Sequence, residues 1–151
     1  MNSQDLKIAK RRLEEEKLTL SIVKRRQVLF ETKSHGVAGF VVALEKVKSK
    51  LDGASVADRV VGKAIALLCV YAKVKSVYAE TISKAAKAVL ENNAIYLERG
   101  RLVERILSAD KTGICPFEQL MEETTNPAEA YMRLKAACYP ASHIKAVPMK
   151  K

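Results

Sequence analysis

The sequence predicts a layered α/β domain in which an antiparallel hairpin leads into alternating strands and helices. Two β-branched segments stand next to each other near the N-terminus, and strand-like and helix-like segments alternate further along the chain. Apolar residues make up 48% of the 151 residues, which is enough for the core of one domain. We expect residues 1–140 to form this domain and residues 141–151 to form a flexible basic tail.

The N-terminal region predicts a helix followed by the hairpin. Residues 3–17 place apolar side chains near one face and good helix formers on the other. Residues 18–24 and 27–33 are rich in β-branched side chains and read as two strands. The two residues between them, Arg25 and Arg26, are not those that a tight primed turn prefers, so we expect a slightly longer turn.

The middle of the chain predicts two helices in succession. Residues 40–50 form an amphipathic pattern with a lysine-rich exposed side, and residues 51–55 form a turn. Ser55 followed by Asp58 fits a variant of the capping box, so we expect a buried helix to run from there to about Tyr71.

The second half predicts further strand and helix units, whose strands should pair in parallel. The expected segments are a strand at 74–80, a helix at 81–93 with Thr81 or Ser83 as its cap, a strand at 94–100, a short helix at 101–108 and a loop at 109–113.

Two later helices are expected to begin at prolines. Pro116 suits the first helical position, which makes Cys115 the capping residue, and Glu118 could close this cap locally. Asn126 and Pro127 repeat the pattern.

The composition excludes several classes of protein. No stretch approaches the roughly 18 apolar residues of a membrane helix, and the N-terminus lacks the apolar segment of a secretory signal, so we expect a soluble cytoplasmic protein. The three cysteines are far apart, and no histidine or cysteine cluster has metal-ligand spacing, so we expect neither a disulfide framework, a metal site nor a cofactor.

The net charge of +10 is uneven along the chain. Residues 1–50 hold 12 basic and 6 acidic side chains, twice as many basic as acidic. This basic third could attract nucleic acid or another polyanion, or it could be an ordinary solvated surface. Aromatic residues make up only 5%, which gives little support for a surface that stacks single-stranded bases.

The sequence DRVVGKAIALL at 58–68 contains a Gly-Lys pair that raises the possibility of a phosphate-binding loop. The first glycine of that motif is replaced by Ala57 and its Ser/Thr by Ala64, and the pair is expected to lie inside the helix. These differences exclude the motif. Lys63 would then share a helical stripe with Arg59, where two cations could face an anion. The alternative is that Gly62 permits close packing and Lys63 extends to water.

Several of these segments together resemble those of a known family. They are residues 58–68, Lys75–Ala79 with Ile82 and Ser83, 112–116 and 126–130. From about Leu18 to Leu134 the chain resembles an uncharacterised prokaryotic domain family placed in the cytidine-deaminase-like fold. This resemblance implies three α/β/α layers around a mixed sheet that starts with an antiparallel hairpin.

The resemblance also implies where zinc chemistry would lie. In zinc deaminases an H-x-E motif opens the second core helix, and P-C-x-x-C opens the next one. We expect these positions near Asp58, Gly62 and Lys63, and near Glu80–Ser83. None of these residues is His or Cys, so zinc-dependent deamination is not expected.

What remains is a remodelled pocket where two helix N-termini meet, which would favour a small polar or anionic ligand, nucleotide-like by analogy of fold. The candidate residues are Lys63 as base or charge clamp, Asp58 as base or orienting group, Cys115 as a nucleophile or a packing residue, and Gly62, Arg59, Thr81 and Ser83 as binding residues. The alternative function is a non-catalytic module that binds nucleic acid or an acidic partner through its basic N-terminal third.

Overall fold

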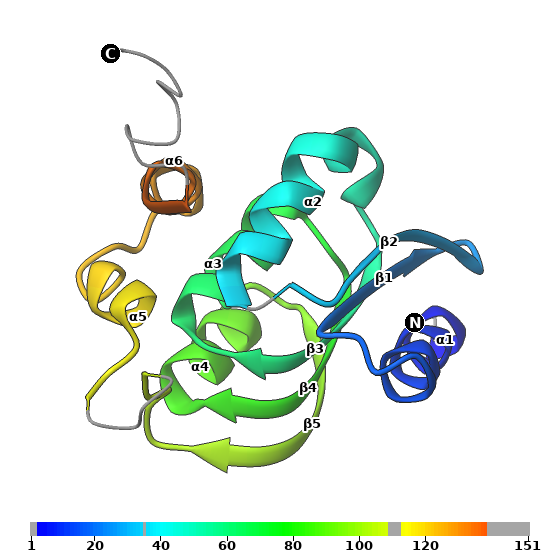
Figure 1. The fold of residues 1–151 in the computed structure, drawn as a ribbon, viewed down its shortest axis with the longest axis horizontal. Coiled ribbons are helices and arrows are strands. Elements are labelled where there is room, and N and C mark those ends of the chain that lie inside the picture. Colours follow the sequence, from blue (N-terminus) through cyan, green and yellow to red (C-terminus); the bar gives the residue numbers. More distant parts are fainter. Residues whose placement is uncertain (1–2, 35, 109–112, 139–151) are drawn as a thin grey trace.

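The computed structural model describes residues 3–34, 36–108 and 113–138 and contains a five-stranded sheet with helices on both faces (Figure 1). The elements in chain order are α1 (Ser3–Glu15), β1 (Leu20–Lys24), β2 (Gln27–Thr32), α2 (Gly36–Leu51), β3 (Ser55–Val61), α3 (Lys63–Ala72), β4 (Ser76–Ser83), α4 (Lys84–Asn92), β5 (Tyr96–Val103), α5 (Pro116–Leu120) and α6 (Pro127–Cys138).

The sheet is mixed, with the strand order β2-β1-β3-β4-β5. β1 pairs antiparallel with both β2 and β3, whereas β3, β4 and β5 run parallel to one another. The predicted α/β class, the antiparallel hairpin at the start of the sheet and the parallel pairing of the helix-linked strands are therefore confirmed. This is the mixed sheet that the cytidine-deaminase-like resemblance implied.

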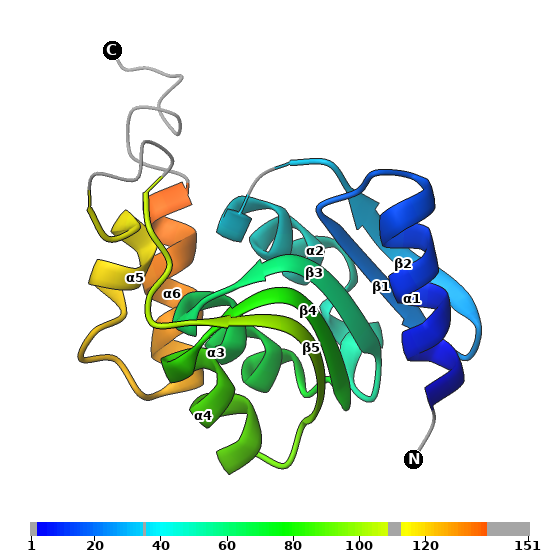
Figure 2. The same ribbon diagram turned by 90° about the horizontal axis from the view of Figure 1, so that it is seen from below.

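The two faces of the sheet are covered unequally (Figure 2). On one face α1 packs against β1, β3 and β4 through a small cluster that includes Leu6, Leu13 and Tyr78. On the other face lie α2, α3 and α4, and α6 packs outside them against α2 and α3. The larger core cluster fills this second side around Phe40 and Leu68. No helix of the described residues is long and apolar enough to cross a membrane.

The hairpin turn is tighter than the sequence predicted. Lys24 pairs with Gln27, so only Arg25 and Arg26 form the turn, and both have positive φ, 53° and 66°. Asp5 on α1 makes this turn possible, because its buried carboxylate accepts both turn N–H groups, at 3.0 and 2.9 Å. The expectation of a longer turn was wrong because it considered only local preference and not support from another element.

The predicted helix from Ser55 to Tyr71 is two elements. Residues 55–61 form β3, and α3 begins only at Lys63. Ser55 does not cap a helix, since its hydroxyl is buried and lies 2.6 Å from that of Ser76 on β4. Strand and helix are both apolar and only Gly62 separates them, so the sequence lacks the usual punctuation between the two.

The predicted helix at 101–108 is also wrong. β5 continues to Val103 because Arg101, Leu102 and Val103 pair with β4, and Leu107 then forms an isolated bridge with Ile114. The parallel partner strand extends to Ser83 and holds these residues in the sheet.

The helix starts predicted at Pro116 and Pro127 are confirmed, whereas the helix predicted at 81–93 begins only at Lys84 because residues 81–83 belong to β4, so that Ser83 and not Thr81 is its cap. Ser83 caps α4, Cys115 and Pro116 open α5, and the Asn126 side chain accepts the N–H of Glu129 at the start of α6. The expected basic tail at 141–151 and most of the expected loop at 109–113 lie outside the described residues.

Candidate functional site

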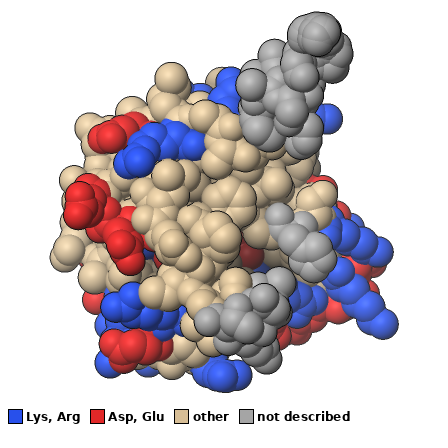
Figure 3. Space-filling model, turned by 60° about the vertical axis from the view of Figure 1, so that its left-hand side comes forward, with Lys and Arg blue, Asp and Glu red and all other residues tan. Residues whose placement is uncertain are grey.

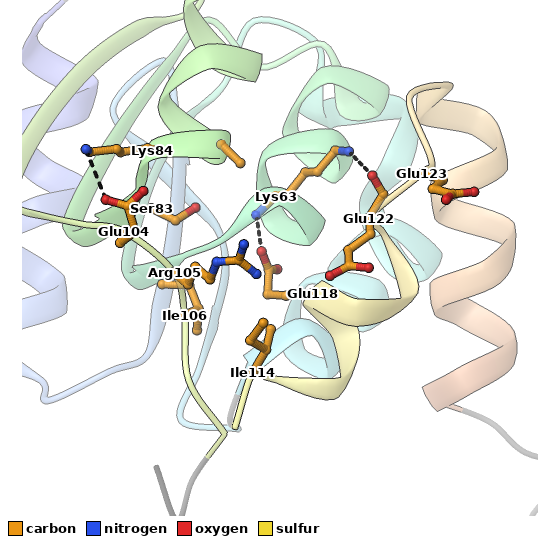
Figure 4. Close-up of a pocket in the computed structure, with 11 residues that line it drawn as sticks. Lys63, Ser83, Lys84, Glu104, Arg105, Ile106, Ile114, Glu118, Glu122 and Glu123 are labelled. Atoms are coloured by element: carbon orange, nitrogen blue, oxygen red, sulfur yellow. Dashed lines mark hydrogen bonds and ion pairs between the residues drawn. The ribbon is translucent and has the colours of Figure 1, made fainter. Parts of the chain in front are cut away.

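A cleft of about 560 Å³ lies where β3 and β4 end and α3 and α4 begin (Figure 4). Its wall on the other side is formed by the segment after β5 and by α5 with the turn that follows it. The lining residues are Lys63, Ser83, Lys84, Ala85, Glu104, Arg105, Ile106, Ile114, Glu118, Glu122 and Glu123. Two helix N-termini therefore meet at one cleft, as the family resemblance implied.

The N-terminus of α3 already holds a carboxylate. Glu118 on α5 accepts the N–H of Lys63 at 2.7 Å and the N–H of Ala64 at 3.1 Å. These are among the N–H groups of a helix that have no partner within the helix, and the helix dipole adds to their attraction for an anion. The expectation that Glu118 would close the local cap of α5 is therefore wrong, because its carboxylate caps α3, more than 50 residues away in the sequence.

Gly62 leaves the space that this carboxylate occupies. It is the N-cap of α3, and a Cβ atom on it would lie 2.4 Å from Oε2 of Glu118. The alternative proposed for Gly62, close packing, is thus the one observed, but the neighbour is a side chain of α5 and not a crossing strand.

α5 is held in place by its own short contacts. The backbone N–H of Cys115 donates to Ile106, and the Gln119 side chain donates to the carbonyl of Ile114. Met121, directly after the helix, is fully buried in the main core. These contacts fix the side of α5 that carries Glu118 against the start of α3.

The N-terminus of α4 forms the second polar wall. The Ser83 hydroxyl accepts the N–H of Ala86 at 3.2 Å, and Ser83 is only 2% exposed. No acceptor for the hydroxyl proton of Ser83 occurs among the described residues, so this proton can be donated into the cleft. Lys84 forms an ion pair of 3.0 Å with Glu104.

The remaining charged side chains of the cleft differ in how far they are engaged. Lys63 donates from Nζ to the carbonyl oxygen of Glu122 at 3.2 Å. The guanidinium of Arg105 is exposed and has no partner in the part of the chain that the structure describes, and Figure 4 shows it between Ser83 and Glu118. Arg105 is thus the cation of the cleft most available to a ligand.

The residues predicted for the site do not all meet in this cleft. Lys63 and Ser83 line it, and Gly62 lies directly behind Glu118. Cys115 is half-buried at the start of α5 and Thr81 lies within β4, and neither lines the cleft.

Asp58 lies within the sheet and apart from the cleft. It belongs to β3 and is 7% exposed. Burial raises the pKa of its carboxyl group to about 8, although backbone N–H groups of Val60 and Arg59 oppose the shift. The same burial, and the nearby Asp58, raise the pKa of the Cys69 thiol on α3.

Arg59 does not share a helical stripe with Lys63. It lies on β3 and turns to the opposite face of the sheet, where it donates to the carbonyls of Leu18 and Leu13 at 2.9 and 2.8 Å. It also forms an ion pair of 3.5 Å with Glu80. Its contacts connect the end of α1 to the sheet.

The sequence reasoning missed Arg105 and Glu104 and assigned Glu118 to the wrong helix. Glu104 and Arg105 follow β5, whose last residues were predicted to be helical, so the direction in which their side chains point could not be inferred. Only Gly62 indicated in the sequence that Glu118 contacts α3. A glycine at this position suggests that another group packs closely against the backbone, but it does not identify that group.

The deaminase motif positions also shift. The chain's second helix is α2, which begins at Gly36, and the next is α3, which begins at Lys63. Counted in this way, the position of the H-x-E motif would be the start of α2 and that of the P-C-x-x-C motif the start of α3, each one helix earlier than expected. His35, which directly precedes α2, lies outside the described residues.

The side chains that the structure describes at the start of α3 do not fit a zinc ion. α3 opens with Lys63, Ala64 and Ile65, none of which is a thiolate or an imidazole. Within the described ranges no group of three or more His, Cys, Asp or Glu residues could hold a metal ion.

Charge on the surface near this site is mixed. On the face brought forward in Figure 3, Lys and Arg side chains stand among Asp and Glu side chains around a wide uncharged area. This face therefore does not present the single-sign field that a polyanion would favour.

Comparison with known proteins identifies one family. The model of DUF1893, described as a domain of unknown function, matches residues 8–137. A DUF1893 family protein from Thermotoga maritima has a crystal structure that is similar with a TM-score of 0.83 and 26% sequence identity, over 91% of this chain and 92% of that chain. RibD of Acinetobacter baumannii is similar over 79% of this chain and 32% of that chain, with 21% identity and a TM-score of 0.45. No curated protein matches.

Proposed function

This chain belongs to the DUF1893 family, and we propose that it binds a small anionic ligand in the cleft between the N-termini of α3 and α4. The observation that carries the proposal is the carboxylate of Glu118, held by two N–H groups of α3 inside the cleft. It is an anion bound by the protein itself at one helix N-terminus, and the second N-terminus, that of α4, opens to the same space.

The anionic group of the ligand would lie at the α4 end. There the first N–H groups of α4, the hydroxyl proton of Ser83 and the guanidinium of Arg105 are available as donors. Arginine suits this role because its planar fork of N–H groups matches a carboxylate or phosphate.

The opposite end of the cleft would take the uncharged part of the ligand. Glu122 and Glu123 line it and can accept hydrogen bonds from hydroxyl or amino groups. A volume of about 560 Å³ lies in the usual range for small-molecule sites. A nucleoside monophosphate combines these features, with a phosphate for the α4 end and ribose hydroxyls for the glutamates.

Thermal unfolding with a ligand panel tests the proposal. The panel consists of inorganic phosphate, small carboxylates, nucleoside monophosphates and the uncharged nucleosides. At a concentration 100 times Kd, binding should stabilise the fold by about 2.7 kcal/mol, or roughly 5–10 °C in Tm for a chain of this length. We expect at least one anionic compound to raise Tm and the uncharged nucleosides to have little effect.

Variants locate the site. Arg105→Gln should remove most of the ligand-induced rise in Tm, and Lys63→Ala should reduce it less, because its ammonium group is already engaged by Glu122. Lys46→Gln is the matched control, since it removes one exposed positive charge of α2. An equal ligand-induced rise in wild type, Arg105→Gln and Lys63→Ala would contradict this site.

A further inference from the structure

The start of α4 carries a cation where an acidic residue is the favourable choice. Lys84 is the first residue of α4, and the first turn of this helix contains no acidic side chain. The positive end of the helix dipole lies there, so a lysine at this position is unfavourable unless a negative group lies beside it. Lys84 therefore needs a negative partner.

That partner is Glu104, which follows β5. Nζ of Lys84 lies 3.0 Å from Oε1 of Glu104, and both residues line the cleft (Figure 4). The two side chains are 62% and 75% exposed, and an ion pair as exposed as this contributes little to stability. An anion that binds more strongly at the start of α4 can therefore take the place of the Glu104 carboxylate.

Other donors lie at the same end of the cleft. Ser83, the N-cap of α4, is 2% exposed, and its hydroxyl proton has no acceptor among the described residues. In Figure 4 this hydroxyl lies between the Lys84–Glu104 pair and the guanidinium of Arg105. The other three carboxylates of the cleft belong to α5 and to the turn after it, so the α4 end holds two cations and one acid.

We propose that Lys84 makes the cleft specific for a phosphate group over a carboxylate, and that Glu104 is the internal competitor of that phosphate. This inference rests on the proposed binding of an anion in the cleft. A phosphate monoester carries close to two negative charges at neutral pH and three acceptor oxygens, so it can bind Arg105, Ser83 and Lys84 together. A carboxylate has one charge and two oxygens, which Arg105 and Ser83 already satisfy. Lys84 thus leaves Glu104 for a phosphate and stays with it for a carboxylate.

The rise of Tm with the concentration of methyl phosphate and of acetate tests the proposal, because it gives a Kd for each probe. The two probes share a methyl group and differ in the anionic group. The contact with Lys84 should make methyl phosphate bind to the wild-type protein roughly fivefold more tightly than acetate.

Substitutions at the two ends of the ion pair should have opposite effects. Lys84→Gln removes the cation and should weaken the binding of methyl phosphate roughly fivefold, whereas Glu104→Gln removes the competitor and should strengthen it roughly two- to fivefold. Neither variant should change the Kd of acetate by more than about twofold. Both side chains are exposed, so the Tm of the protein without a probe should stay within about 2 °C of wild type.

The pair of Lys87 and Glu91 provides a matched control on the same helix. Its two charged groups lie 2.9 Å apart, and neither residue lines the cleft. Lys87→Gln and Glu91→Gln should leave the Kd of both probes at the wild-type value.

Several results would overturn the role of Lys84 and leave the anion site in place. They are an equal Kd for the two probes in wild type, a change in the same direction in Lys84→Gln and Glu104→Gln, and an effect of Lys87→Gln as large as that of Lys84→Gln. The second result would mean that the ion pair only fastens the end of β5 to α4, and the third that net charge alone sets the affinity. If neither probe raises Tm, the proposed function fails together with this inference.

Discussion

The substitution Gly62→Ala tests whether the start of α3 is built to hold the Glu118 carboxylate. A Cβ atom at position 62 would lie 2.4 Å from Oε2 and 2.5 Å from Cδ of Glu118. No side-chain Cβ makes such contacts, so the carboxylate has to move away. It then loses its hydrogen bonds to the N–H groups of Lys63 at 2.7 Å and Ala64 at 3.1 Å.

The expected loss of stability follows from these contacts. A side chain that caps a helix N-terminus contributes about 0.5–2 kcal/mol, and a negative charge there adds to the effect. Alanine is also a poorer N-cap than glycine, by roughly 0.5 kcal/mol. Gly62→Ala should therefore destabilise by about 2 kcal/mol, and Glu118→Ala by about 1.5 kcal/mol. For a chain of this size 1 kcal/mol corresponds to roughly 2–4 °C in Tm.

A double-mutant cycle measured by urea unfolding separates this contact from other effects. In the Glu118→Ala variant there is no carboxylate for the new Cβ atom at position 62 to displace. Gly62→Ala should then destabilise the protein by only roughly 0.5 kcal/mol, the difference between alanine and glycine as an N-cap. The two substitutions should therefore be less than additive, with a coupling of about 1–2 kcal/mol. Glu118→Gln should lie between wild type and Glu118→Ala, because its amide has one acceptor oxygen where the carboxylate has two. Additive losses within about 0.5 kcal/mol would refute the reasoning.

Three other regions of the fold offer tests. Burial raises the pKa of Asp58 to about 8, so the folded wild-type protein favours the neutral carboxyl group and loses stability as pH rises from about 4 to 8, by at most about 1.4 kcal/mol per pH unit. Asp58→Asn lacks this titrating group and should not lose stability in this way. The variant should therefore be more stable than wild type by an amount that grows from about pH 4 to pH 8. Parallel stability curves for the two proteins would contradict this assignment. Asp5→Ala should cost about 1–3 kcal/mol in urea unfolding, since it removes the acceptor of both turn N–H groups, and a loss below 0.5 kcal/mol would mean that water replaces it. Gly100→Ala should cost about 1–3 kcal/mol, because its Cβ would lie 2.6 Å from the backbone oxygen of Glu80 on the neighbouring strand; an unchanged Tm would show that β5 can shift away.

The errors in the sequence-based prediction of strands have different causes. Residues 55–61 and 101–103 were assigned to helices, although each lies in the parallel part of the sheet. Residues 55–61 form a mostly buried parallel strand, which lacks the alternation of a strand exposed on one face and so resembles a buried helix. Residues 101–103 end a largely exposed edge strand, and they are held in the sheet by pairing with the long partner strand β4. The hairpin turn failed differently, because the acceptor for its N–H groups lies on α1.

The candidate site was predicted in part. Lys63 and Ser83 were singled out and both line the cleft, since each lies where a strand ends and a helix begins. Asp58 and Cys115 were grouped with them on chemical grounds, but the one lies within β3 and the other at the start of α5. Arg105 could not be found, because its direction depends on where β5 ends.

The sequence by itself determined the α/β class, the hairpin at the start of the sheet, and the helix starts at Ser83, Cys115 and Asn126. These features depend on local periodicity, on the capping side chains of Ser83 and Asn126, each within three residues of its partner, and on Pro116 at the first turn of α5. Only the tertiary structure decided that Glu118 caps α3 and that Asp5 holds the turn of two arginines. Both contacts join residues at least 20 positions apart, and the free energy of such pairs comes from a geometry that local sequence preferences do not contain.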